Sequence, residues 1–159
     1  MGETPSIPQG PTDQHEQMMN KVGEWTVACQ YFLGGETVAA EGVELVEALG
    51  PYWTVGHFRC EMMGTEISGV STSGFDPAKG KYTGTWQDSA TPYFYYFEGD
   101  IDEDGRLVME GENYDPFTSS TATYRSIQTL GKDQRTLELY IIKPDTDPFQ
   151  VLEYSYTRA

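Results

Sequence analysis

Apolar and polar residues alternate with a period of two along most of this chain, beginning near position 24. In the first such run, Trp25, Val27 and Cys29 share one face, and Thr26 and Gln30 lie on the other. This alternation is typical of β-strands that bury one face. Strands are therefore expected over residues 24–33, 36–49, 52–62, 65–75, 81–88, 93–101, 106–113, 121–130, 135–143 and 149–158.

Short turn sequences separate these strands. Gly34-Gly35 follows the first strand, and Asp-Pro-Ala-Lys-Gly at 76–80 separates the fourth from the fifth. Pro presets the backbone of such a turn, and Gly accepts its left-handed position. Evenly spaced strands with short turns favour an up-and-down meander, and closing it removes the exposed sheet edges. The predicted fold class is all-β, a single antiparallel up-and-down β-barrel of about ten strands. A sandwich is the alternative, but no long Greek-key crossover is visible.

One short helix is expected over 11–22, with the barrel strands spanning 24–158. Thr12 suits the N-cap, Asp13 is favourable in the first turn, and Gly23 ends the helix. An apolar stripe on this helix could pack over one mouth of the barrel; it consists of Met18, Met19 and Val22.

Length and composition favour one domain, over 11–159, preceded by a polar, Pro-rich stretch at 1–10 that is expected to be a disordered tail. No apolar run approaches ~18 residues, and the first residues do not resemble a signal peptide. We therefore expect a soluble, cytoplasmic protein.

The chain is strongly acidic, with 25 Asp and Glu against 10 Lys and Arg, which gives a formal net charge of -15. Such a surface repels phosphate backbones and anionic lipid headgroups, so neither a nucleic acid nor a membrane is expected as a partner. A monomer or a homodimer is expected.

No metal or other cofactor is expected. Cys29 and Cys60 lie within predicted strands without a metal-binding spacing, and are interpreted as buried thiols. The segment 100–105, Asp-Ile-Asp-Glu-Asp-Gly, resembles the first half of a calcium loop, but Gly111 occupies the position of its bidentate Glu, which favours a solvated turn. No His follows His57, which argues against haem.

Five short motifs follow one another along the chain: Val22-Gly23-Glu24-Trp25, Glu61-Met62-Met63-Gly64, Gly74-Phe75-Asp76-Pro77-x-x-Gly80-Lys81-Tyr82, Thr85-Trp86-x-Asp88-Ser89 and Tyr154-x-Tyr156-Thr157-Arg158. In order and spacing they resemble the bacterial family catalogued as domain of unknown function 1579. The resemblance implies a lipocalin-like shape and supplies no established reaction. The pair Trp25 and Arg158 is also similar to that of calycin barrels, in which the Arg lies across the indole and closes one end, an interaction worth roughly 0.5–2 kcal/mol.

Two basic residues, Arg59 and Arg125, fall in the middle of predicted strands, whereas Arg135 and most others lie at or beside turns. A mid-strand Arg points either into the barrel, where it could hold an anionic group of a ligand, or outward into a cross-strand ion pair. His57 shares a strand face with Arg59, and could serve as a ligand contact, an acid/base or a structural group.

Aromatic residues concentrate at Trp86 and in the run 93–97. If they point inward, Trp86, Tyr96 and Tyr140 would line a cavity with apolar rings and polar tips, which suits an amphipathic molecule. Ordinary core packing is the alternative.

The leading hypothesis is a binding protein that holds a small amphipathic or apolar molecule in the barrel, with expected contacts at His57, Arg59, Trp86, Tyr96, Arg125 and Tyr140. The alternatives are an enzyme acting in the same cavity with His57 or Asp88 as acid/base, and a structural or interaction domain with a filled core.

Overall fold

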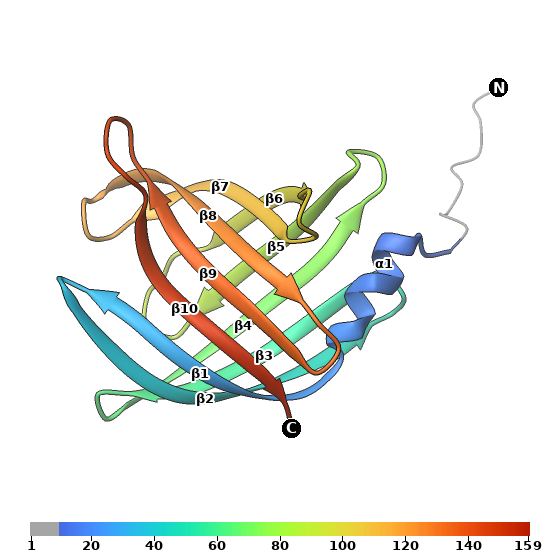
Figure 1. Cartoon of the computed structure of the whole chain (residues 1–159), viewed down its shortest axis with the longest axis horizontal. Coiled ribbons are helices and arrows are strands. Elements are labelled where there is room, and N and C mark those ends of the chain that lie inside the picture. The colour runs from blue at the N-terminus through green and yellow to red at the C-terminus, as the bar shows by residue number, and fades with distance from the viewer. Residues whose placement is uncertain (1–9) are drawn as a thin grey trace.

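Ten antiparallel strands close into a barrel in the computed structural model, which describes residues 10–159 (Figure 1). Each strand pairs with its neighbour in the sequence, and the last strand returns to pair with the first. This topology confirms the predicted fold class. Of the expected tail at 1–10, only Gly10 is among the described residues.

Two helical turns precede the barrel, α1 (Asp13–Met18) and the 3-10 turn η1 (Met19–Lys21). The strand bounds differ from those predicted by at most two residues at each end: β1 (Gly23–Leu33), β2 (Glu36–Leu49), β3 (Trp53–Met62), β4 (Thr65–Asp76), β5 (Lys81–Asp88), β6 (Tyr95–Ile101), β7 (Leu107–Asp115), β8 (Ser120–Leu130), β9 (Gln134–Ile142) and β10 (Phe149–Arg158).

The helical segment lies at the barrel end where β1 begins, called here the closed end (Figure 1). Thr12 caps α1, since its side chain accepts a hydrogen bond from the His15 amide, and the His15 imidazole bonds to Phe75 O of β4 (2.9 Å). Met18 is only 1% exposed, but Val22 is 38% exposed. The expected apolar stripe is therefore reduced to Met18, because the chain leaves the helix before Val22 can reach the barrel.

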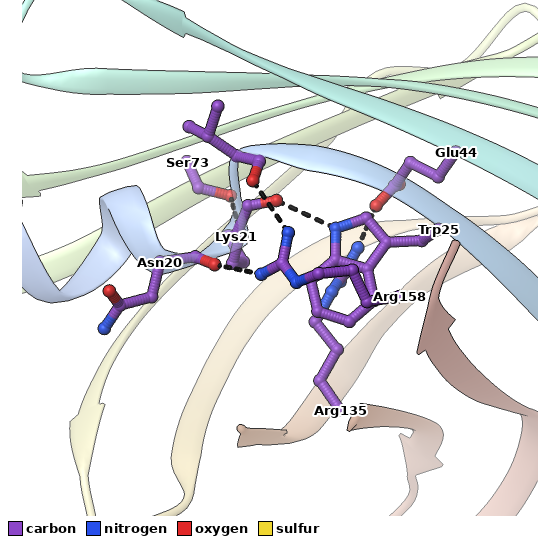
Figure 2. A network of polar contacts seen from close by, with 8 residues as sticks. Asn20, Lys21, Trp25, Glu44, Ser73, Arg135 and Arg158 are labelled. Atoms are coloured by element: carbon purple, nitrogen blue, oxygen red, sulfur yellow. Dashed lines mark hydrogen bonds and ion pairs between the residues drawn. The ribbon is translucent and has the colours of Figure 1, made fainter. Parts of the chain in front are cut away.

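The Trp25 indole fixes the junction between this segment and the barrel. Its Nε1 donates to Lys21 O (2.8 Å), and the Arg158 guanidinium lies 4.2 Å from its ring centre (Figure 2). Arg158 also donates to three carbonyl oxygens, those of Asn20 (2.7 Å), Val22 (2.9 Å) and Lys132 (2.9 Å). The last strand therefore holds both the first strand and the turn that precedes it.

Gly23 makes this junction possible. Its φ of +135° lies in a region that favours glycine, and a Cβ at this position would lie 2.5 Å from Arg158 Nη1. Any side chain here would displace the guanidinium.

No helix among residues 10–159 has both the length and the apolar character needed to cross a membrane.

Replacement of Arg158 by Ala should destabilise the barrel, because it removes three hydrogen bonds and the contact with Trp25. We expect a loss of about 2–3 kcal/mol, or roughly 5–10 °C in Tm, together with a change in Trp fluorescence. Arg125→Ala is the matched control: it removes an Arg of an exposed ion pair, which is worth about 0–1 kcal/mol. Equal melting temperatures for the two variants would contradict a closing role for Arg158.

Candidate functional site

Strand alternation decides which side chains enter the barrel. Trp25 faces Arg158 and Glu44 across its two neighbouring strands, and the inward set continues in this register from strand to strand. Several inward residues are nevertheless only half-buried, which means that solvent reaches part of the interior: Ser71, Trp86, Tyr95, Gln128, Leu137, Leu139 and Leu152.

Aromatic rings form one wall of this interior. Phe58 stacks on Tyr154 with ring centres 5.2 Å apart, and lies 5.9 Å from Trp86. Trp86 Nε1 donates to Asp88 Oδ2 (2.8 Å), so the polar edge of the indole is fixed. Trp86 packs directly on Gly69, where a Cβ would lie 2.2 Å from the indole Cη2. The absence of a side chain at Gly69 thus determines where the indole lies.

Tyrosine hydroxyls add polar groups to the same wall. Tyr31 and Tyr154 share a hydrogen bond (2.7 Å), and the Tyr31 hydroxyl also contacts Cys60 Sγ (3.5 Å). Burial raises the pKa of both phenols and raises the pKa of the Cys29 thiol to about 12. These groups are therefore neutral hydrogen-bonding and packing groups at physiological pH, and Cys29 is a poor nucleophile.

A charged cluster, called here the polar floor, lies at the closed end of the interior and consists of Lys21, Glu44, Ser73 and Arg135 (Figure 2). Arg135 of β9 forms an ion pair with Glu44 of β2, and each side chain is only 6% exposed. The Arg135 guanidinium lies 3.6 Å from the centre of the Tyr156 ring, and its Nε has no hydrogen-bond partner. Lys21 Nζ donates to Ser73 Oγ (3.1 Å).

The polar floor contains two cationic side chains and one carboxylate. Burial and, to a lesser extent, the positive charge of Arg135 lower the pKa of Lys21 to about 8, although Glu44 opposes the shift. Below this pH Lys21 is mainly protonated, so the polar floor carries a net positive charge inside a strongly acidic protein.

Several of the residues expected to contact a ligand lie outside the barrel. His57 and Arg59 alternate with the inward residues Phe58 and Cys60 and are exposed, and Arg59 lines an open outer groove of about 550 Å³. An inward direction for either residue is wrong, because the register of β3 with β2 turns Phe58 toward the core. His57 therefore cannot serve as an acid/base inside the barrel.

The other residues expected to contact a ligand also divide into those that face outward and those that face inward. Arg125 points outward and pairs with Glu110 (2.7 Å), which is the cross-strand alternative. Tyr96 is 37% exposed, and Tyr140, opposite Arg125, lies on the same outer face. Of the residues expected to contact a ligand, only Trp86 faces the interior, and the predicted acid/base Asp88 lies on the same face. The inward placement of Tyr96 and Tyr140 is therefore wrong, since the preceding residues on the same strands, Tyr95 of β6 and Leu139 of β9, point inward instead.

Sequence reasoning missed Arg135. It lies beside a turn, as expected, but β9 begins one residue earlier, at Gln134. The signal was present: Ile141, Leu139 and Leu137 face inward, and the same period of two reaches Arg135. Within residues 10–159, no group of three or more His, Cys, Asp or Glu side chains is arranged to hold a metal ion.

Comparisons with known proteins give a family and a fold. The profile described as "Protein of unknown function (DUF1579)" matches residues 10–158. A solved structure of the S-type phycobiliprotein lyase CPES from Guillardia theta superposes with a TM-score of 0.63 at 10% sequence identity, and the match covers 94% of this chain and 98% of that one. A search of curated proteins finds no match.

Protonation of Lys21 should couple to stability. The folded pKa of about 8 lies below the ordinary value of 10.5, so the unfolded chain binds more protons between these limits, and stability rises as pH rises. From pH 8 to 10 the free energy of unfolding should increase by about 2 kcal/mol more in the wild type than in Lys21→Met. Chemical denaturation across this range measures the difference, and the subtraction removes the common contributions of Tyr and Cys. Parallel profiles would contradict a buried, titrating Lys21.

Proposed function

We propose that this chain, which belongs to the DUF1579 family of proteins of unknown function, binds a small amphipathic or apolar molecule inside its barrel. The observation that carries the proposal is the half-buried state of inward residues such as Trp86, Leu137, Leu139 and Leu152. A filled core would bury these side chains, because their large apolar surfaces gain from exclusion of water.

The chemistry of the lining supports an amphipathic ligand. Aliphatic side chains from β9 and β10 face aromatic rings from β3 and β5, and polar tips are provided by Tyr31, Tyr154 and Trp86. Mixed walls of this kind are typical of small-molecule sites. A similar barrel of known structure is that of a phycobiliprotein lyase, and at 10% identity it supports the shape alone.

The opposite end of the barrel supplies a route of access. There, exposed apolar side chains lie in or directly beside four of the connections between strands: Met63, Phe94, Phe117 and Phe149, which are 49–81% exposed. Both helical elements of the described chain lie at the other end. An apolar rim next to an accessible interior would favour capture of an apolar molecule.

A neutral apolar probe, N-phenyl-1-naphthylamine, tests this proposal. We expect saturable fluorescence enhancement with the wild type and about tenfold weaker binding for Gly69→Ala, because the new methyl group forces Trp86 into the interior. The measurement is a fluorescence titration with added protein.

Gly74→Ala is the matched control. It crowds another indole, Trp53, on the outer face of the same strand, with a Cβ 2.5 Å from Trp53 Cε3, and should leave probe binding unchanged. Absence of saturable binding by the wild type, together with a bare mass in native mass spectrometry of the mildly purified protein, would contradict the proposal. Equal effects of the two substitutions would show that the probe binds elsewhere.

A further inference from the structure

We infer that the polar floor is the binding site for a single carboxylate on the ligand, so that the preferred ligand is an amphipathic monocarboxylate whose apolar body points away from the closed end of the barrel. The inference rests on the proposed function, since it assigns the polar end of the molecule held in the same interior.

Charge is the first argument. Lys21 and Arg135 contribute two positive charges against the single carboxylate of Glu44, and each of the three side chains is more than nine-tenths buried. A buried excess cation is costly unless an anion accompanies it. One monoanion would neutralise the excess, whereas a dianion such as a phosphate monoester would reverse it.

Hydrogen bonding is the second argument. Arg135 uses Nη2 to reach Glu44, and the buried Nε retains a donor without a partner. Buried donors of charged groups are rarely left unpaired, because the desolvation is then uncompensated. The planar guanidinium already lies against the Tyr156 ring, so its orientation is fixed before a ligand arrives.

The direction of the ligand follows from β9. Its inward residues run from Ile141 through Leu139 and Leu137 to Arg135, which means that an apolar track ends at the cation. Tyr154, which pairs with Leu137 from the neighbouring strand β10, and Trp86 of β5 belong to the aromatic wall. An apolar ligand with a carboxylate at one end matches this order of surfaces. A ligand with a neutral end would leave the excess positive charge of the polar floor without a counter-charge.

Competition by two ligands of equal chain length separates this inference from the proposed function. Decanoate and 1-decanol differ at the head group alone, and each is used to displace N-phenyl-1-naphthylamine at pH 7. For the wild type we expect decanoate to bind at least about tenfold more tightly than decanol. In Arg135→Met the ratio should fall to about one, while decanol binding changes little.

Two further variants keep the test decisive. Arg135→Met leaves Glu44 buried without its arginine partner, so the triple variant Lys21→Met/Glu44→Gln/Arg135→Met, which removes all three charges, should show the same loss of preference if the single variant folds poorly. Glu44→Gln alone removes the competing carboxylate and should raise the preference for decanoate severalfold. Arg125→Met, in the exposed pair with Glu110, is the control and should leave the ratio unchanged.

The outcomes are distinguishable. Equal affinity of decanoate and decanol for the wild type, or a preference that survives loss of Arg135, would overturn the carboxylate site while leaving interior binding intact. Failure of the probe and both competitors to bind would overturn the proposed function and this inference together.

Discussion

The position of Trp25 between two guanidinium groups is the constraint on which the closed end depends. Arg158 lies 4.2 Å from the indole centre, and Arg135 lies 4.6 Å from it. Cations are attracted to the faces of an aromatic ring, and the contact gains strength where water is excluded. The indole therefore links the first strand to β9 and β10, while its Nε1 holds the turn that carries Lys21. One side chain sets the relative positions of three strands and a helical turn.

This arrangement gives the two arginines different environments. Arg158 donates hydrogen bonds to backbone carbonyls at the closed end, and so completes the closure of the barrel. Arg135 lies deep in the barrel with an anionic partner and an unused donor. Because both arginines contact the same indole, the stability of the barrel and the electrostatic potential of its interior depend on each other. The positively charged polar floor also lies within a chain of net charge -15, so the electrostatic potential that a charged ligand meets differs between the surface and the interior.

The strands and the helix cap could be predicted because they depend on local patterns, the period of two and the residue Thr12. The inward face of β3 could not. Its two faces are almost equally apolar, since Trp53 and Val55 balance Phe58 and Cys60, and the choice is made by pairing with β2. Arg135 was missed for a related reason: proximity to a turn suggested exposure, whereas the register of β9 carries it inward. The polar floor joins residues from η1, β2, β4 and β9, and no sequence spacing reveals such a meeting.

The contact between Arg158 and the turn before β1 joins residues 136 positions apart. A barrel has no free sheet edge only after this closure, so before it forms, β1 and β10 both present unpaired backbone groups. Contacts between such distant residues carry a large loop-closure entropy and form slowly. The residues that close the finished barrel therefore also determine how long its two edge strands stay open to pairing with other chains during folding.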